Sequence, residues 1–391
     1  MLFDSGIDYY SLDNPLIYFL SEFSNLIFCF LFVFIFFALK KINSMEAIFW
    51  VSLFVVAFLI NLFINQNQFP DIGGYLRCVR DIRDNLYFDE LGCQIIQSGG
   101  GENLTLYSFK RGLPAIIYSL IPMPSISTFA SIGLINKLYL FFLYIFLKPH
   151  ISQPKNLIIL AVVFILPSML LYSSLGLRDN LIFCTQVLLL FSLVKRQLFF
   201  STILLAVLAA IKIQNGLIFS FLYIGIFIFQ ADRSTKALFL YCSVVLLFMI
   251  AMGDVLLATL NYFKLAFLSE DKVLANIGSF VPFKSVIELI AISPLSFVEG
   301  MVRPLPQNIT SSVFLIESMI HVAIIFWLLK SQFQKISYNP QFLIVLFTFI
   351  IGIVLNDLVI VNDFTYIRYK YTFVSLFIIY LLTYKHTPKK N

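Results

Sequence analysis

Residues 16–65 read LIYFLSEFSNLIFCFLFVFIFFALKKINSMEAIFWVSLFVVAFLINLFIN. This stretch consists of two apolar runs, 16–39 and 46–65, with the adjacent Lys40 and Lys41 between them. Each run is about 20 residues long, which is the length that an α-helix needs to cross a bilayer. Short connections rich in Lys and Arg stay in the cytoplasm. The stretch therefore predicts two membrane-spanning helices joined on the cytoplasmic side.

The same alternation of apolar runs and basic connections continues to the end of the chain. Thirteen of the 27 Lys and Arg lie in six short connections, with only Glu46 and Asp232 as acids beside them. The six basic clusters are Lys40-Lys41, Lys148 with Lys155, Lys195-Arg196, Arg233 with Lys236, Lys330 with Lys335, and Lys385 with Lys389-Lys390. The expected spans are 16–39, 46–65, 126–147, 156–173, 179–194, 197–211, 214–230, 236–260, 313–329, 341–361 and 369–384. With every basic cluster inside, these eleven spans put the N-terminus in the periplasm and the C-terminus in the cytoplasm.

The composition indicates an all-α, polytopic integral membrane protein, which we expect to form a single membrane domain over residues 1–391. The mean hydropathy is +0.92, and 12% of the residues are charged, whereas soluble domains carry about 25% charge. The net charge of +6 is accounted for by the cytoplasmic connections. Nucleic-acid binding would need a basic stripe on a soluble face, and the sequence contains no such stripe. The three histidines are scattered and no CxxC motif occurs, so the sequence implies no metal or other cofactor.

Two long polar stretches, 66–112 and 261–312, are expected to face the periplasm as large loops. Ordered loops longer than about 12–15 residues are usually functional. The second loop contains an amphipathic piece near 284–298 that we expect to lie on the membrane surface. Just after the first loop, the apolar piece 113–122 is short and bracketed by prolines, so we predict a re-entrant or interfacial helix. As a span, it would reverse the orientation of the first loop.

The first loop also carries two cysteines, Cys78 and Cys93. They can pair as a disulfide if the loop faces an oxidising compartment, and two free thiols are the alternative. Cys29, Cys184 and Cys242 lie in apolar runs, where we expect small core residues.

Arg77, Arg80 and Arg83, hereafter the arginine stripe, recur every third residue in the first loop. On a helix, residues at this spacing lie along one side. Guanidinium groups are always charged and bind phosphate oxygens in pairs, so the stripe is suited to hold a diphosphate. The alternative is a solvated helix whose arginines pair with Asp81 and Asp84.

Asp71 lies just beyond the second span, where its carboxylate is well placed to act as a general base, although it can also cap the helix that follows.

Ionisable residues at the ends of apolar helices are candidates for a functional role, and ion pairing is the alternative explanation. Four such cations are Arg178, Lys212, Arg303 and Arg368. Lys212 can also extend its side chain to the interface. Together with the arginine stripe, these cations are expected to bind a dianionic lipid-linked headgroup, whereas a cation transporter would need the opposite charge.

Three of these elements together resemble EpsG-type and Wzy-type polysaccharide polymerases. They are the periplasmic Asp71 and Tyr75 soon after the second span, the Arg-bearing turn Leu177-Arg178-Asp179-Asn180, and Arg368-Tyr369-Lys370 at the start of the last helix. The layout of the whole chain is similar as well, with many spans, two large periplasmic loops and 45 phenylalanines.

This resemblance implies a multi-pass glycosyltransferase of the O-antigen polymerase type in the bacterial inner membrane. It would join undecaprenyl-diphosphate-linked oligosaccharide repeat units into surface polysaccharide on the periplasmic face, without a cofactor. The implied catalytic residue is Asp71, and the substrate-binding residues are Tyr75, Arg77, Arg80, Arg178, Lys212, Arg303, Arg368 and Tyr369. The implied partners are the lipid-linked oligosaccharide, membrane lipid and a chain-length regulator protein. Two alternatives stay open: a polyprenyl-phosphate-sugar-dependent membrane glycosyltransferase, and a flippase or transporter for the same lipid-linked glycans.

The predicted orientation can be measured with reporter fusions. Fusions near Glu90 and Asp271 should report a periplasmic location. Fusions after one residue of each basic cluster should report the cytoplasm, because short basic connections are retained there; these are Lys40, Lys148, Lys195, Arg233, Lys330 and Lys385. A cytoplasmic Glu90 would mean that 113–122 crosses the membrane and that the predicted catalytic face is inverted.

Overall fold

The computed structural model describes residues 15–63, 70–85, 109–126, 128–151, 153–231, 239–241, 243–245, 247, 251–270, 281–336, 339–360 and 362–383. Within these ranges every regular element is a helix, which confirms the all-α class. Among the described residues, five helical segments are long and apolar enough to cross a membrane: Phe19–Ala38, Ser44–Phe63, Phe129–His150, Ile309–Ser331 and Pro340–Val359. A bent pair of helices makes up to six. The spans expected at 179–194, 197–211 and 214–230 are shorter apolar helices, namely α8 (Asp179–Val194), α9 (Leu198–Ile211) and α10 (Ile213–Ala231).

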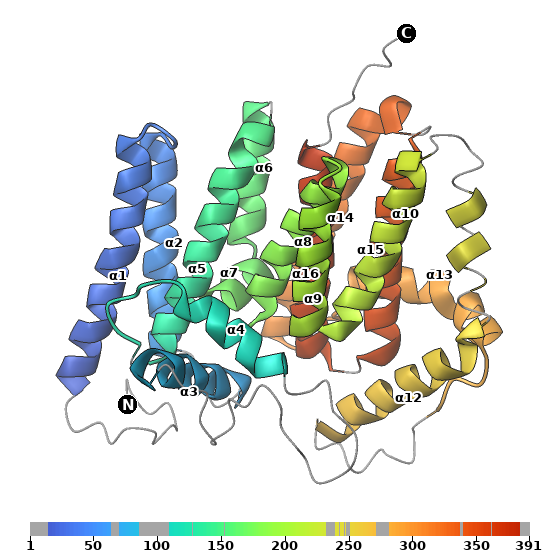
Figure 1. Cartoon of the computed structure of the whole chain (residues 1–391), viewed down its shortest axis with the longest axis horizontal. Coiled ribbons are helices and arrows are strands. Elements are labelled where there is room, and N and C mark those ends of the chain that lie inside the picture. The colour runs from blue at the N-terminus through green and yellow to red at the C-terminus, as the bar shows by residue number, and fades with distance from the viewer. Residues whose placement is uncertain are drawn as a thin grey trace. The chain divides into compact units, whose positions relative to one another are not determined.

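The chain divides into two compact units, where the sequence alone predicted one membrane domain. Unit 1 comprises Met1–Thr185 with Val207–Ile213, and unit 2 comprises Gln186–Ala206 with Gln214–Asn391. Figure 1 shows both units as bundles of helices. In unit 1 the upright helices are α1 (Pro15–Ala38), α2 (Ser44–Phe63), α5 (Phe129–Leu147), α6 (Pro154–Ile165) and α7 (Pro167–Ser174).

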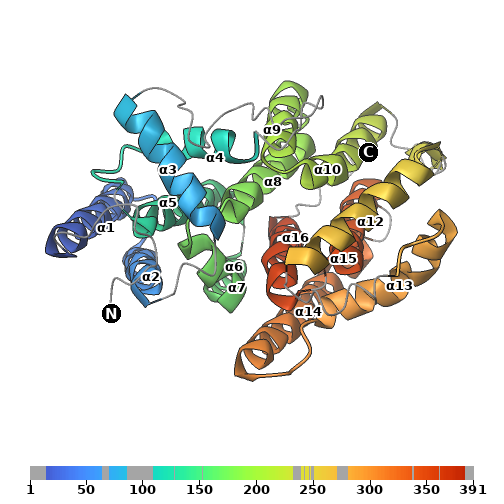
Figure 2. The same cartoon turned by 90° about the horizontal axis from the view of Figure 1, so that it is seen from below.

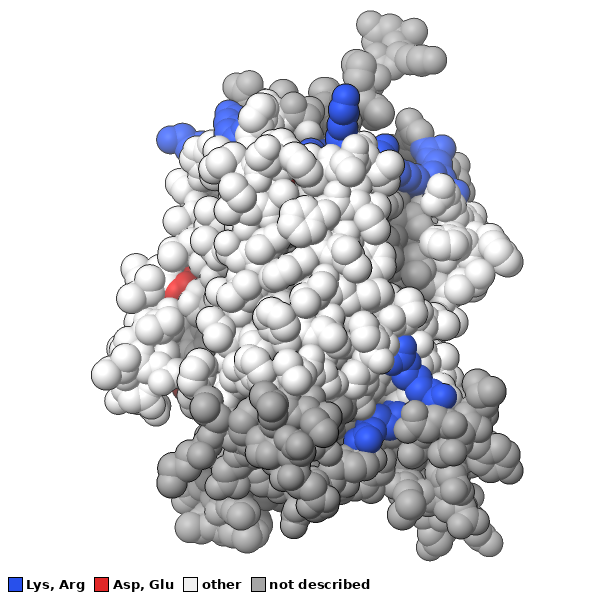
Figure 3. All heavy atoms as spheres, turned by 90° about the vertical axis from the view of Figure 1, so that its left-hand side faces the viewer, with Lys and Arg blue, Asp and Glu red and all other residues white. Residues whose placement is uncertain are grey.

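One end of unit 1 gathers two of the predicted basic connections. The Lys148 ammonium donates to the Glu46 carboxylate at 2.7 Å and to the Lys41 carbonyl at 2.8 Å. The Tyr144 hydroxyl donates to the other Glu46 oxygen. The turn after α1 and the end of α5 therefore lie together. On the side of α1 and α2, a broad band without Lys or Arg separates those near one end of the picture from those near the other, with a small acidic patch at the edge of this band (Figure 3).

Within unit 1, the buried carboxylate of Glu22 links α1 to the start of α5. Glu22 accepts hydrogen bonds from the Thr128 hydroxyl at 2.7 Å and from the Ser131 hydroxyl at 2.6 Å. Asn25, one turn later, donates to Glu22 and to the Ser125 carbonyl. A carboxylate beside a helix N-terminus interacts favourably with the helix dipole. Glu22 therefore anchors α1 to the start of α5.

Two short helices lie across the upright ones at the end of unit 1 opposite the Lys41–Glu46 connection (Figures 1 and 2). They are α3 (Pro70–Asn85) and α4 (Phe109–Ser119). The arginine stripe is therefore on a helix, as predicted. An 11-residue α4 is only about 16 Å long, roughly half of the hydrocarbon core. This length agrees with the predicted re-entrant or interfacial helix and is too short for a span.

The span expected at 156–173 is broken. The axis turns by 62° between α6 and α7. Proline has no N–H to donate and disfavours helical backbone in the residue before it. Pro167 begins α7, and Leu166 before it has non-helical backbone angles. A second interruption follows at 175–178, before α8 begins at Asp179.

Cys78 of α3 is disulfide-bonded, which confirms that this cysteine is paired. Its predicted partner, Cys93, lies outside the described residues. Cys29 and Cys184 are free and buried, in agreement with their prediction as core residues.

Unit 2 contains α12 (Gly253–Glu270), α13 (Val286–Val302), α14 (Ile309–Ile336), α15 (Pro340–Val359) and α16 (Asp363–Thr383). The later part of α8, most of α9 and most of α10 also belong to it. Of the span expected at 236–260, the described residues 239–241, 243–245 and 247 are helical. The next helix, α12, begins at Gly253 and runs on into the predicted second loop. The predicted amphipathic piece is α13.

The two helices α12 and α13 pack against the C-terminal end of α15. The buried residues that join them are Leu260 of α12, Phe283, Leu289 of α13 and Val359 of α15. Asn261 reinforces this contact, because its side chain both donates to and accepts from the Phe283 backbone. Much of the predicted second loop is therefore ordered helix that packs on the end of a long apolar helix.

Candidate functional site

The interruption at 175–178 in unit 1 is held by side chains from three other helices. Asn61 of α2 donates to the Ser174 carbonyl at 2.7 Å. Asn136 of α5 donates to the carbonyls of Leu175 at 2.6 Å and Leu177 at 2.7 Å. A buried carbonyl without a donor costs free energy comparable to a lost hydrogen bond. These asparagines therefore stabilise a non-helical segment inside the bundle.

Two further features fix the same segment. The Tyr118 hydroxyl of α4 donates to the Leu177 carbonyl at 3.0 Å. Gly133 of α5 lies so close to α7 that a Cβ atom there would collide with the Ser174 carbonyl oxygen. The backbone of α5 can therefore approach the end of α7 only because residue 133 has no side chain.

Arg178 and Lys212 lie together at two neighbouring helix interruptions of unit 1. Arg178 immediately precedes α8 and is 4% exposed, and Lys212 lies between α9 and α10 and is 8% exposed. The Arg178 Nη1 donates to the carbonyl of Ile211, the neighbour of Lys212, at 3.0 Å. Two of the predicted cations are thus buried at interruptions that touch each other through Arg178 and the Ile211 carbonyl. Asp179, which begins α8, is the adjacent acid and is also buried.

A chain of contacts connects this pair to α3, where Asp71 and Tyr75 lie. Tyr75 is buried and packs edge-on against Tyr118, with the ring centroids 6.4 Å apart. Tyr118 in turn bonds to the segment that carries Arg178. Asp71 lies in the first turn of α3, one turn before Tyr75, and its side chain lies outside the described part of the chain. Unit 1 therefore links three predicted site residues, Tyr75, Arg178 and Lys212.

The arginine stripe is not uniform. Arg83 donates to the carbonyls of Ile121 and Met123, each at 2.9 Å, and so holds the turn that follows α4. Arg80 is half-buried. Arg77 lies in the middle of α3, and its side chain is not among those described. At least Arg83 has a structural contact that the spacing did not predict.

In unit 2, Arg303 follows the last turn of α13 and binds two carboxylates. Its Nε donates to Asp363 Oδ1 at 2.5 Å, and its Nη1 lies 3.5 Å from Asp357 Oδ1. Nη1 also donates to the Ile360 carbonyl, and the guanidinium lies over the Tyr366 ring at 4.9 Å. For Arg303, the structure shows the ion-paired arrangement that was the alternative to anion binding.

Lys370, beside the predicted Arg368 and Tyr369, is a buried donor to backbone. Its ammonium donates to the carbonyls of Met301 at 2.7 Å and Arg303 at 2.8 Å, and to the Ser318 hydroxyl at 2.9 Å. Arg368 and Tyr369 are half-buried, with the guanidinium 5.8 Å from the Tyr369 ring centroid. The Arg-Tyr-Lys element thus combines two partly accessible side chains with one lysine that holds the end of α13.

Three charged residues within the expected spans, which the sequence left unassigned, have separate environments. Lys137 is fully buried and donates to the Ser173 hydroxyl at 2.6 Å. Glu317 and His321 are buried one turn apart on α14, with His321 Nε2 4.0 Å from Glu317 Oε1. Asp254 is exposed in the first turn of α12.

Sequence reasoning missed several polar residues that matter here. Asn61, Asn136 and Glu22 lie within expected apolar spans, and Asp357 lies near the end of one. An isolated polar residue in such a run is costly unless it has a partner, and this was the available signal. The sequence could not identify the hydrogen-bond partners of these residues, because the partners lie on other helices.

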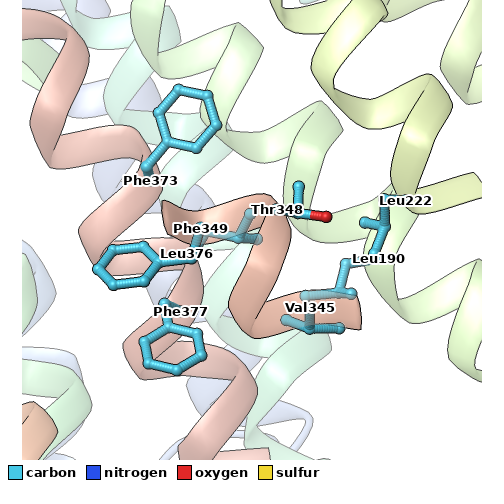
Figure 4. A pocket seen from close by; sticks show the side chains of 8 residues that line it. All are labelled: Leu190, Leu222, Val345, Thr348, Phe349, Phe373, Leu376 and Phe377. Carbon is cyan, nitrogen blue, oxygen red and sulfur yellow. The ribbon is translucent and has the colours of Figure 1, made fainter. Parts of the chain in front are cut away.

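The apolar pocket in Figure 4 lies within unit 2, between α8, α10, α15 and α16. Its lining residues are Leu190, Leu222, Val345, Thr348, Phe349, Phe373, Leu376 and Phe377. The single hydroxyl among them, Thr348, donates to its own helix at the Ile344 carbonyl. This pocket contains none of the predicted site residues and offers no group for acid–base or anion chemistry.

Comparison of the chain with family models, curated proteins and solved structures gave no match.

Replacing Asn136 by leucine should destabilise unit 1 by about 2–6 kcal/mol, because two buried carbonyls lose their donor and each loss costs about 1–3 kcal/mol. Unfolding of the detergent-solubilised protein measures this. Thr259→Val is the matched control, since it removes a side chain–backbone hydrogen bond at an exposed position and should change stability by less than about 0.5 kcal/mol. Equal effects of the two variants would contradict a special role of the interruption.

Proposed function

We propose that this protein is a glycosyltransferase that polymerises undecaprenyl-diphosphate-linked oligosaccharide repeat units on the periplasmic face of a bacterial inner membrane. The observation that carries the proposal is the buried pair Arg178 and Lys212 in unit 1, connected through Tyr118 to the helix that carries Asp71. Burial of cations in an apolar bundle is costly unless an anion accompanies them, and Asp179, which follows Arg178 in the chain, supplies one negative charge. A lipid-linked diphosphate would supply more.

The reaction needs these charges. In the proposed step, the bond between the anomeric carbon of the growing glycan and its diphosphate oxygen breaks, and a hydroxyl of the incoming repeat unit forms the new glycosidic bond. The diphosphate leaves with the electron pair, so positive charge near it stabilises the transition state. Arg178 and Lys212 are proposed for this role. Asp71 is proposed to take the proton of the attacking hydroxyl.

The expected orientation agrees with two observations on unit 1. The α3–α4 end lies opposite the end where Lys148 and the Lys41–Glu46 connection meet. Cys78 on α3 is disulfide-bonded, and structural disulfides persist in oxidising compartments such as the periplasm. Both observations support placing α3 and its Asp71 on the periplasmic side.

Deleting the gene tests the proposed reaction. The mutant should make surface glycan carrying a single repeat unit, because export continues without polymerisation. Complementation with the wild-type gene should restore the ladder, whereas Asp71→Asn should not, at normal membrane abundance. Electrophoresis of the glycan is the readout. A mutant that makes no surface repeat unit would indicate a flippase, and an active Asp71→Asn variant would exclude this residue as the base.

Arg178→Lys should fail almost as badly as Arg178→Ala in the same complementation assay. An ammonium cannot reproduce the two parallel hydrogen bonds that a guanidinium makes to a phosphate group. Arg196→Lys is the matched control, because Arg196 is exposed in the connection between α8 and α9, and it should be silent. If Arg178 only anchored the bundle through the Ile211 carbonyl, lysine would restore a normal ladder.

A further inference from the structure

The turn between α1 and α2 carries two exposed lysines, Lys40 and Lys41. The two helices have 24 and 20 residues, so they are about 36 Å and about 30 Å long. Each is therefore long enough to cross the hydrocarbon core of a bilayer, which is about 30 Å thick. The turn that joins their ends lies where the phosphate groups of the lipids begin, and both ammonium groups are accessible there.

A second basic connection adds positive charge to the same end of unit 1. The Lys148 ammonium at the end of α5 donates to the Lys41 carbonyl at 2.8 Å and pairs with Glu46 at 2.7 Å. The two connections, 39–46 and 148–156, contain four lysines and a single acid, Glu46. Four positive charges against one negative charge leave a net charge of +3. Because Lys148 already neutralises Glu46, this excess belongs to the other three lysines.

Neither Lys40 nor Lys41 forms an ion pair with a described residue. Their charge is therefore compensated only by solvent or by a ligand from outside the described part of the chain. Lys155, the remaining lysine of the second connection, is exposed in the first turn of α6. An anion that approaches this end of unit 1 thus meets accessible positive charge from two connections.

The backbone at Lys40 does not call for a lysine. Its φ is 55°, in the left-handed region where a side chain costs free energy and glycine is favoured. The N–H groups of Lys40 and Lys41 donate to the carbonyls of Phe37 and Phe36, each at 2.9 Å. This is the helix-ending arrangement that usually has glycine at the left-handed position. The turn would therefore form at least as well with glycine, and what the lysine adds is its charge.

Exposed apolar side chains lie within a few residues of the two lysines. Leu39 is 60% exposed, Met45 is 76% exposed and Ile48 is 62% exposed. On this side of α1 and α2, a broad band without Lys or Arg follows the cations near one end (Figure 3). A ligand at the turn therefore contacts cations and an apolar surface next to them. A phospholipid with an anionic headgroup matches both, whereas a free phosphate ion matches only the cations.

We propose that Lys40 and Lys41, with Lys155 in the neighbouring connection, bind the headgroup of an anionic phospholipid whose acyl chains lie along the apolar surface of α1 and α2. Each lysine near the membrane surface contributes about a fivefold gain in affinity for an anionic lipid. The proposal does not depend on the proposed function. It concerns the end of unit 1 opposite α3 and α4.

Isothermal titration calorimetry of the delipidated, detergent-solubilised full-length protein with dioctanoyl phosphatidylglycerol tests the site. Dioctanoyl phosphatidylcholine, which has the same acyl chains but no net charge, should bind about tenfold more weakly or worse. The double variant Lys40→Gly with Lys41→Gln should bind phosphatidylglycerol about 25-fold more weakly, since it lacks two of the lysines. Lys40→Gly suits the left-handed backbone, so the turn should be retained.

Two single substitutions serve as controls. Lys41→Arg keeps the charge and should keep the affinity. Lys284→Gln removes an exposed lysine of unit 2 and should leave phosphatidylglycerol binding unchanged. A loss of affinity in Lys284→Gln as large as in the double variant would mean that the lipid responds to total charge, and this would overturn the site.

Three further results would also overturn the proposal. The first is equal affinity of the wild type for the two lipids. The second is unchanged phosphatidylglycerol affinity in the double variant; together with lower stability, it would mean that the lysines only interact with the dipole at the end of α1. The third is inorganic phosphate that competes as tightly as the lipid, since the acyl chains would then contribute nothing and the site would bind a free anion.

Discussion

Buried backbone carbonyls at helix interruptions are the constraint on which both units depend. The last four carbonyls of a helix have no partner within it, and inside an apolar bundle water cannot supply one. This chain supplies donors from neighbouring helices. In unit 1, Asn61 and Asn136 donate to the carbonyls at the end of α7 and just beyond it. In unit 2, the Tyr366 hydroxyl and the Lys370 ammonium donate to the carbonyls at the end of α13. The interruptions are therefore fixed parts of the fold, and the residues within them have defined positions.

An arginine follows both α7 and α13, as Arg178 and Arg303, but the surrounding charges differ. Arg178 and Lys212 are both buried, Arg178 contacts the carbonyl of the residue before Lys212, and Asp179 follows Arg178 in the chain. Arg303 contacts both Asp357 and Asp363. A guanidinium already neutralised by two carboxylates attracts a further anion far less than one beside a second cation. The cations that sequence reasoning grouped as one diphosphate-binding set therefore have different capacities. Strong anion attraction is expected from the pair in unit 1, and hydrogen bonding to neutral groups from the carboxylates in unit 2.

The elements of the fold were largely predictable, because apolar runs and proline positions are local signals. The arginine stripe predicted helix α3, and the prolines around 113–122 indicated a helix too short to span, as α4 is. The partners of single polar residues were not predictable. Nothing in the spacing of Arg83 reveals that it donates to carbonyls beyond α4, and nothing near Lys370 in sequence reveals its contact with the end of α13. These contacts join segments about 40 and 70 residues apart, and only the packing of the helices decides which donor meets which carbonyl.

This division between local and long-range signals also explains which site residues were found. Charged residues in short turns, such as Arg178, are conspicuous in sequence because their cost in an apolar environment is evident. Asp357 is less conspicuous, since an acid near a helix end can simply face water. Its environment follows from two facts of packing: Ser296 donates to one of its oxygens, and the other lies 3.5 Å from Nη1 of Arg303. A reaction between a charged leaving group and a neutral sugar needs both kinds of environment, one positive and one able to accept hydrogen bonds. Unit 1 contains an environment of the first kind and unit 2 contains one of the second kind.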